Sequence, residues 1–275
     1  MGKMGSRLEI SIITVVRNGL PYIEETLRSV LSQDYPDIEY IVIDGGSTDG
    51  TVELIRKYQQ KIKYWVSEPD KGISDAFNKG LARAGGDYIL FLNADDALAN
   101  DRVISEIVHQ VAENGDPDLI YGDCEVLDRA SGESRYITDI DLNLSKFCKG
   151  RQMLPHPCLF AHRNYFSKYG NFDIRFRIGM DYEWLLRGIA EARVVHVPLV
   201  ITRVRDGGVS ALNIELAVKE LFMALALHGY LQGWFRKSMF RIYYFGRQSM
   251  KKLLKVINLY DRFSILRHRL YGRKN

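Results

Sequence analysis

Strand-like and helix-like segments alternate regularly along the first 122 residues. Polar turns such as Arg17-Asn18-Gly19 and Asp44-Gly45-Gly46 end the apolar, β-branched runs, and Pro36 ends the first helical segment. The predicted strands are 8–16, 39–43, 63–66, 88–92 and 118–121, and the predicted helices between them are 23–31, 51–60, 73–84 and 101–114. Because such alternation is typical of βαβ units, we expect an α/β fold with a mostly parallel sheet flanked by helices.

The alternation stops after residue 122. Residues 125–153 show no clear period, and a helix pattern at 181–192 and a strand pattern at 194–202 follow. A chain of 275 residues with 46% apolar and 26% charged content is expected to form one main domain with an appendage. The three cysteines form no CxxC pair, which argues against a disulfide framework or a thiolate metal site and favours a reducing compartment.

Charge is distributed unevenly along the chain. The net charge is +4, yet residues 213–275 carry 13 Lys/Arg against 3 Asp/Glu, so the preceding 212 residues are acidic. The basic segment is also rich in aromatic residues and helical in composition. We therefore place a boundary at 212/213, between an acidic body and a basic helical extension.

The residues that follow the predicted strands are polar. Ligands of open α/β sheets bind at the carboxyl ends of the strands, so these residues are expected to line a site. In the turn 44–51 the glycines permit a close approach of backbone to ligand, and Asp44 is placed to accept a hydrogen bond from a nucleobase. The alternative is a strand-to-helix turn capped by Ser47 or Asp49. Neither a phosphate loop nor a GxGxxG motif is present.

The run Ile89-Leu-Phe-Leu-Asn-Ala-Asp-Asp96 ends an apolar strand with two adjacent acids. Neighbouring carboxylates repel each other unless a cation or hydrogen-bond donors offset the charge. Oxygen ligands without nearby His or Cys suit Mg²⁺ or Mn²⁺, with substrate phosphates completing the shell. The alternative is that Asp95, Asp96 or Asn100 caps the helix that begins at Asp101.

Asp181 stands at the start of the segment Asp-Tyr-Glu-Trp-Leu-Leu-Arg. One interpretation is a helix N-cap, which is a common role for Asp. The other is a general base that takes a proton from an acceptor hydroxyl.

Five segments together resemble the family 2 glycosyltransferases of the GT-A fold, especially bacterial enzymes that assemble capsule, exopolysaccharide and lipopolysaccharide. In chain order they are SIITVVRN, IDGGSTDGT, SEPDKGISDAFNKG, YILFLNADD and MDYEWLLR. The resemblance covers residues 8 to about 212. It implies a catalytic domain at 1–212, with a nucleotide-binding half at about 8–122 and an acceptor and catalytic half at about 123–212, followed by the extension 213–275.

The resemblance also implies roles for individual residues. The first two strand ends would hold the nucleotide through Thr14, Val16, Asn18, Asp44, Gly46 and Ser47. A loop near the nucleotide and the helix behind it would contribute Asp70, Lys71, Gly72, Asp75 and Asn78. The DxD-type motif would correspond to Asn93, Ala94, Asp95 and Asp96, with a divalent metal, Mn²⁺ or Mg²⁺, at Asp95 and Asp96. Asp181 matches the catalytic base of inverting members.

Two positions depart from the family pattern. Asn93 replaces the first acid of the DxD-type motif, which removes a negative charge near the metal, and Met180 replaces the Glu that usually precedes the base. Residues 203–210 resemble a loop that closes over the diphosphate, where Arg203 or Arg205 would pair with phosphate oxygens. His156 resembles a site-facing position near the acceptor, with a structural loop histidine as the alternative.

These inferences predict an inverting enzyme that moves a sugar from a nucleotide-diphosphate donor, UDP- or GDP-linked, to a hydroxyl of a glycan or lipid-linked acceptor in cell-surface glycan synthesis. A metal-dependent sugar nucleotidyltransferase is the alternative. Nucleic acid is not an expected partner, because the body is acidic and the known binding signatures are absent.

The extension suggests contact with a membrane. Its aromatic residues, from Trp234 onward, lie among Lys and Arg, a composition that suits an interfacial element attracted to anionic lipid. The apolar stretch 221–235 is too short to span a bilayer. We therefore expect a cytoplasmic protein that associates peripherally with the inner face of the cytoplasmic membrane. The alternative is a helical lid packed on the body.

Overall fold

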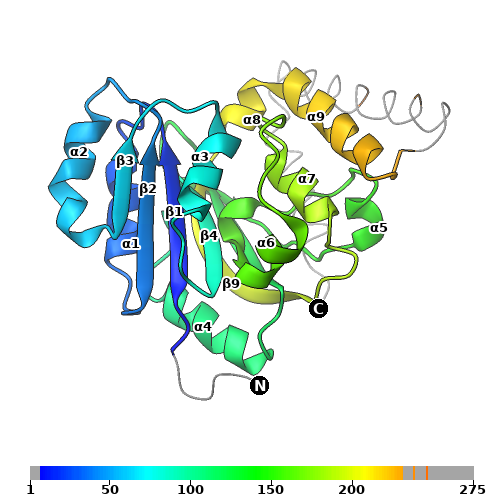
Figure 1. Ribbon diagram of the computed structural model, residues 1–275, viewed down its shortest axis with the longest axis horizontal. Coiled ribbons are helices and arrows are strands. Elements are labelled where there is room, and N and C mark those ends of the chain that lie inside the picture. Colours follow the sequence, from blue (N-terminus) through cyan, green and yellow to red (C-terminus); the bar gives the residue numbers. More distant parts are fainter. Residues whose placement is uncertain (1–6, 232–237, 239–245, 247–275) are drawn as a thin grey trace.

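The first half of the chain forms parallel strands joined by helices (Figure 1). The computed structural model describes residues 7–231 together with positions 238 and 246. Strands β1 (Ile10–Val16), β2 (Ile38–Asp44), β3 (Tyr64–Ser67) and β4 (Tyr88–Asn93) alternate with helices α1 (Ile23–Leu31), α2 (Thr51–Tyr58) and α3 (Ile73–Leu81). A short 3-10 turn, η1 (Gln59–Lys61), follows α2. All pairings in the order β3-β2-β1-β4 are parallel, which confirms the predicted βαβ units.

The second half makes the sheet mixed. Helix α4 (Val103–Glu113) leads to β6 (Leu119–Leu127), β7 (Ser134–Ile137), α5 (Leu144–Phe147), η2 (His156–Cys158), β8 (Leu159–His162), α6 (Arg163–Tyr169), α7 (Met180–Leu186) and β9 (Val194–Arg205). Strand β8 lies antiparallel between β4 and β6, so the predicted fifth strand is not a direct neighbour of the fourth. The sequence patterns missed β8, β7 and the two-residue β5 (Ala97–Leu98), which pairs with the end of β9.

Helices cover both faces of the sheet. Alternate residues of β1 explain this arrangement, because Ile10 and Ile12 pack toward α1, α2 and α4, whereas Ile13 and Val15 pack toward α3, α6 and α7. Both sets are almost completely buried. The two hydrophobic layers hold the sheet in place, and they leave the strand ends and the loops between them to carry polar residues.

Helix α9 (Ile214–Leu227) follows the short helix α8 (Val209–Leu212) and packs against α7. Its buried face includes Val218, Leu221 and Leu225, so the described start of the predicted extension belongs to the packed body. None of the helices in the described residues has the length and apolar character needed to cross a bilayer. The aromatic and basic segment from Trp234 onward lies outside the described residues, apart from the isolated positions 238 and 246, and its membrane contact stays a prediction.

Candidate active site

The ends of β1 and β2 are joined by hydrogen bonds around Asp44. This fully buried carboxylate accepts from the backbone N–H groups of Gly46 and Ser47, both at 3.0 Å, and from the Ser67 hydroxyl at 2.6 Å. Asn18 adopts a left-handed backbone (φ 53°) and its side-chain oxygen accepts from the Thr48 N–H at 2.9 Å. Asp44 therefore stabilises the turn through hydrogen bonds to its backbone, and its contact with a nucleobase remains a prediction.

The same turn supports a helix start, as the alternative interpretation expected. Asp49 accepts from the Thr51 N–H at 3.1 Å and from the Thr51 hydroxyl at 2.6 Å. Gly46 has φ 79°, a left-handed conformation that glycine adopts without steric cost. The turn therefore leads into α2 and brings backbone near the neighbouring loop, but the N-cap of α2 is Gly50 and not Ser47 or Asp49.

That neighbouring loop begins at Asp70. The Asp70 carboxylate lies directly beside Gly45, in the space that a Cβ at this position would occupy. Asp70 accepts from the Gly72 N–H at 2.8 Å, and Asp75 accepts from the Lys71 N–H at 3.0 Å. The ends of β1 and β2 and the loop after β3 therefore meet at one rim, as the sequence predicted.

Three residues predicted at the nucleotide have side chains that are already engaged. Thr14 is fully buried with its hydroxyl bonded to the Tyr40 hydroxyl, and Val16 is 5% exposed inside the sheet. The Asn78 amide donates to the Phe172 carbonyl at 2.8 Å and accepts from the Phe172 N–H at 3.0 Å. Asn78 therefore links α3 to the second half, and any contact of Thr14 or Val16 with a nucleotide would come from their backbone atoms.

The two acids after β4 have different surroundings. Asp95 is 32% exposed and forms an ion pair with Arg129 of the β6–β7 turn. Asp96 is 2% exposed, and burial, reinforced by the charge on Asp95, raises the pKa of its carboxyl to about 7. Neither acid caps α4, nor does Asn100, because the helix begins at Val103 with Arg102 as its N-cap. The Asn100 side chain accepts from the Arg102 N–H at 2.8 Å in the turn before the helix.

The backbone of this motif is fixed from two sides. The Thr26 hydroxyl of α1 lies 3.0 Å from the Ala94 carbonyl and 2.6 Å from the Asp96 carbonyl. Arg205 donates to the Asp95 carbonyl at 2.8 Å, and its guanidinium group lies 4.5 Å from the centre of the Tyr22 ring. Packing on Tyr22 and pairing with Glu25 leave 9% of the Arg205 side chain exposed.

The arginines therefore differ from their predicted placement. Arg203 and Arg205 lie in β9 and not in a loop, because β9 runs three residues beyond the predicted strand end. Arg203 pairs with Glu125 at 3.2 Å and lines a shallow cavity of about 570 Å³ between α1 and β5, and no acid of the motif lines that cavity. Arg129, which the sequence analysis did not single out, is the arginine that contacts the Asp95 carboxylate. It stands in an aperiodic polar turn, where no spacing signal marks it.

Asp181 reaches the motif through His156. Asp181 lies in the first turn of α7, whose N-cap is Gly179, so the N-cap interpretation of Asp181 is wrong. Its carboxylate oxygen Oδ2 lies 3.2 Å from His156 Nδ1, and His156 Nε2 lies 3.2 Å from the Asn93 side-chain oxygen. His156 thus bridges the candidate base and the strand end of the first half, and Asp181 remains 24% exposed.

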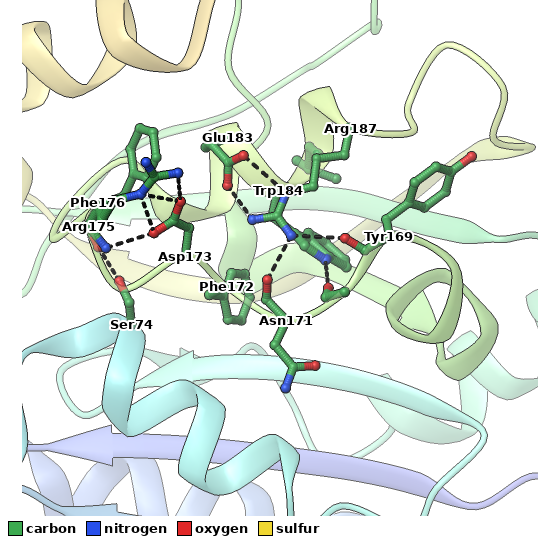
Figure 2. A network of polar contacts seen from close by, with 12 residues as sticks. Ser74, Tyr169, Asn171, Phe172, Asp173, Arg175, Phe176, Glu183, Trp184 and Arg187 are labelled. Atoms are coloured by element: carbon green, nitrogen blue, oxygen red, sulfur yellow. Dashed lines mark hydrogen bonds and ion pairs between the residues drawn. The ribbon is translucent and has the colours of Figure 1, made fainter. Parts of the chain in front are cut away.

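Two buried carboxylates support the segment around Asp181. Glu220 of α9 accepts from the backbone N–H groups of residues 177, 178 and 179, each at 2.8 Å. Glu183 binds Arg187, which donates in turn to the carbonyls of Tyr169 and Asn171 (Figure 2). His228 approaches the same Glu183 carboxylate at 2.8 Å. The partners of Glu220, and His228 as a partner of Glu183, are distant in sequence, so no local pattern marked these contacts, whereas Glu183 and Arg187 lie four residues apart on one helix.

The acids of the motif fit a divalent cation only together with a ligand that brings further oxygens. Asp95 is the accessible carboxylate, and its pairing with Arg129 shows that the position beside it attracts positive charge. Among the residues that the structure describes, no group of three or more His, Cys, Asp or Glu is arranged to hold a metal. Mg²⁺ and Mn²⁺ are commonly held by one or two carboxylates plus substrate phosphates, so this donor set suits such a shared site.

Comparisons with known proteins agree with this geometry. A glycosyltransferase of Mycobacterium tuberculosis with uncharacterized activity is 34% identical over 209 residues, which cover 76% of this chain and 79% of the relative. The Staphylococcus aureus protein TarS, solved as fragment 1–349 with UDP-GlcNAc, has a TM-score of 0.66 at 19% identity, over 80% of this chain and 66% of the fragment. In another crystal structure of TarS, the match covers 39% of the solved chain.

A second solved structure extends over almost the whole chain. It is a mannosyltransferase of Pyrobaculum calidifontis in complex with GDP-Man and Mn²⁺, with a TM-score of 0.55 at 17% identity, over 98% of this chain and 89% of that one. Both structural neighbours establish a GT-A fold. Residues 11–170 match the family described as Glycosyl transferase family 2. The chain therefore belongs to glycosyl transferase family 2 and is a glycosyltransferase.

Proposed function

We propose that this glycosyltransferase moves a sugar from a nucleotide-diphosphate donor to an acceptor hydroxyl and inverts the anomeric centre. The observation that carries the proposal is the approach of Asp181 to the strand-end motif through His156, which brings a partly exposed carboxylate to the rim formed by the first half. The neighbours solved with UDP-GlcNAc and GDP-Man support a nucleotide-sugar donor. Family membership argues against the sugar nucleotidyltransferase that the sequence alone left open.

Asp181 would act as the general base. The acceptor oxygen attacks the anomeric carbon from the face opposite the diphosphate, the bond from that carbon to the diphosphate oxygen breaks, and the hydroxyl proton passes to the Asp181 carboxylate. The donor nucleotide would lie along the rim formed by Asn18, the 44–47 turn and the loop at Asp70. Arg129 is placed to approach the diphosphate, since its guanidinium group already lies at Asp95.

Asp95 is the residue we propose to hold a divalent metal, together with oxygens of the donor diphosphate. When bound, Mn²⁺ or Mg²⁺ supplies positive charge that stabilises the leaving diphosphate. The neighbour solved with Mn²⁺ supports this assignment. Asp96 contributes less directly, because its buried carboxyl accepts from the Asn93 amide at 2.9 Å.

The experiment that tests the function is a screen of UDP- and GDP-sugars for release of nucleotide diphosphate, with and without Mn²⁺. We expect one class of donor to be turned over, and Asp181→Asn to lower its turnover by about 1,000-fold or more while the nucleotide affinity stays the same, because positioned proton transfer contributes about 10²–10⁴-fold. Unchanged turnover in Asp181→Asn contradicts the assignment of the base. Full activity in the presence of a chelator contradicts the metal assignment.

For the acceptor we propose a lipid-linked or polysaccharide intermediate of cell-surface glycan synthesis. The support is the basic and aromatic composition of the sequence after Leu231, which favours contact with anionic lipid. Because α9 packs on the body, the informative truncation follows Leu231 and leaves α9 intact. Co-sedimentation with vesicles that contain anionic lipid should be strong for the full chain and weak for the shortened one. Equal binding of the two would exclude the segment as the contact.

A further inference from the structure

His156 occupies a restricted position between the two halves of the site. It begins the 3-10 turn η2 with proline on either side, and its ring meets the ring of Phe77 edge-on at a centroid distance of 5.9 Å. The side chain is 22% exposed, so the ring faces the site but does not rotate freely in solvent. A histidine placed in this way is positioned as firmly as the strand end beside it.

Both ring nitrogens of His156 lie beside side-chain oxygens. Asn93 donates its amide N–H to Asp96 Oδ2 at 2.9 Å, so the atom that it turns toward His156 Nε2 is an oxygen acceptor. Nε2 therefore faces an acceptor. Nδ1 faces the Asp181 oxygen Oδ2, also an acceptor, so each ring nitrogen lies beside an oxygen to which a ring N–H can donate.

This arrangement gives the Asn93 substitution a physical reason. A carboxamide at position 93 accepts from His156 and donates to Asp96 at the same time, which a carboxylate cannot do. The first acid of the usual motif is thus replaced by the group that continues a chain of hydrogen bonds from Asp96 through Asn93 and His156 to Asp181.

We propose that His156 is a positioning residue for the base. It donates from Nδ1 to the Asp181 oxygen Oδ2 and fixes the carboxylate toward the strand end where the donor is expected. The inference rests on the proposed role of Asp181. It makes Asn93 the second support, because its side-chain oxygen holds His156 in the orientation that turns Nδ1 to the base.

The kinetic experiment uses full-length variants and UDP-GlcNAc or GDP-mannose, whichever the donor screen shows to be turned over. His156→Phe keeps a ring beside Phe77 and removes both hydrogen bonds, so we expect kcat to fall about 100-fold with little change in donor KM. His156→Asn retains a donor near the position of Nδ1 and should recover at least about 10-fold of that loss. His162→Phe is the matched control, because His162 also lies edge-on to an aromatic ring, that of Tyr88, and the structure shows no contact between it and Asp181. It should leave kcat unchanged.

The second measurement needs no donor. In the full chain with ¹⁵N-labelled histidine, the ring resonances of His156, identified by their loss in His156→Asn, should show a proton on Nδ1. Asp181→Asn should shift the Nδ1 resonance, because a neutral carboxamide replaces the carboxylate that accepts from Nδ1. An unprotonated Nδ1 in the wild type, or a spectrum that Asp181→Asn leaves unchanged, overturns the inference.

The two experiments separate this inference from the proposed function. Wild-type turnover in Asp181→Asn contradicts the assignment of Asp181 as the base, whatever the His156 variants show. Loss of turnover in Asp181→Asn combined with wild-type kcat in His156→Phe overturns the role of His156 and leaves the base in place. If His156→Phe does not fold, the rescue by His156→Asn and the ring resonances decide.

Discussion

The two halves of the active site are held by different kinds of interaction. In the first half, Asn18 and Asp44 stand at strand ends, and the sheet, together with short local hydrogen bonds, places them. In the second half, Asp181 lies on a seven-residue helix, and two buried carboxylates fix the surrounding segments: Glu220 binds backbone N–H groups more than 40 residues away, and Glu183 binds Arg187 four residues away and His228 far along the chain. We therefore expect the first arrangement to tolerate the loss of one contact, whereas the second concentrates the positioning of the base in a few buried charges.

The largest effect on stability is expected from Glu183→Ala. Glu183 is 1% exposed and is paired with both Arg187 and His228, so its removal leaves two basic groups without their carboxylate in a partly buried place. Breaking a buried ion pair from one side costs about 3–5 kcal/mol. The free energy of unfolding from urea titration, followed by circular dichroism, measures this loss.

A matched control exists on the surface of the same half. Glu191 also pairs with a basic residue, Lys168, but both side chains are largely exposed to solvent. Glu191→Ala should leave the unfolding midpoint unchanged, because exposed ion pairs contribute little. Equal losses in Glu183→Ala and Glu191→Ala would contradict the view that burial of the charge matters.

The next effect concerns pH and belongs to the first half. Burial raises the pKa of Asp96 to about 7, whereas the same carboxyl in the unfolded chain has a pKa of about 4. Between about pH 4 and pH 7 the folded state retains a proton that the unfolded state has lost, so the free energy of unfolding should fall as the pH rises through this window and level off above it. The full shift corresponds to at most about 4 kcal/mol.

This pH dependence is measured by urea titrations at a series of pH values in the presence of a chelator. Asp96→Asn replaces the carboxyl by a neutral group of the same shape and should flatten the slope between about pH 4 and pH 7. Parallel curves for the wild type and Asp96→Asn would show that Asp96 does not titrate in this range.

A smaller loss is expected for Glu220→Ala. The substitution removes the acceptor of three backbone N–H groups in the loop just before Asp181, and water can reach part of that loop, so we expect about 2–3 kcal/mol. Donor turnover should fall as well, because this loop leads into α7. Glu215→Ala is the control on the exposed side of α9 and should change neither quantity. If folded Glu220→Ala keeps the wild-type turnover, the loop before Asp181 does not contribute to positioning the base.

The same contrast explains which parts of the fold could be predicted from the sequence. The βα alternation up to residue 93 was predicted closely, because each strand has an apolar run and each helix its own period. Strand β8 was missed because it is four residues long. It lies between β4 and β6, and both of these strands are distant from it along the chain. The end of β9 was placed at 202 because Arg203 and Arg205 look like loop residues, whereas pairing with β6 and β5 continues the strand.

The candidate site divides in the same way. Asp44, Asp70, Asp95 and Asp181 carry signals in their local motifs, and the structure brings their surroundings together. Arg129 and Glu220 carry no local signal, since each acts through a partner more than 30 residues away. The bridge at His156 was only partly predicted, because the resemblance placed this residue toward the site but gave no indication of the residues that its ring would join.

The smallest expected effect tests the point where the halves meet at Asp95. Arg129 of the second half pairs with this first-half carboxylate, and both side chains are about one-third exposed. Arg129→Met should free Asp95 and tighten the binding of Mn²⁺ to the nucleotide-free protein by about 5-fold, which corresponds to about 1 kcal/mol, the size of a partly exposed ion pair. Titration with Mn²⁺ followed by electron paramagnetic resonance measures this affinity. Arg28→Met is the control: it removes the same charge from α1, where Arg28 pairs with Glu24, and should leave the affinity for Mn²⁺ unchanged. An unchanged or weaker affinity in Arg129→Met would mean that Arg129 does not compete with the metal for Asp95.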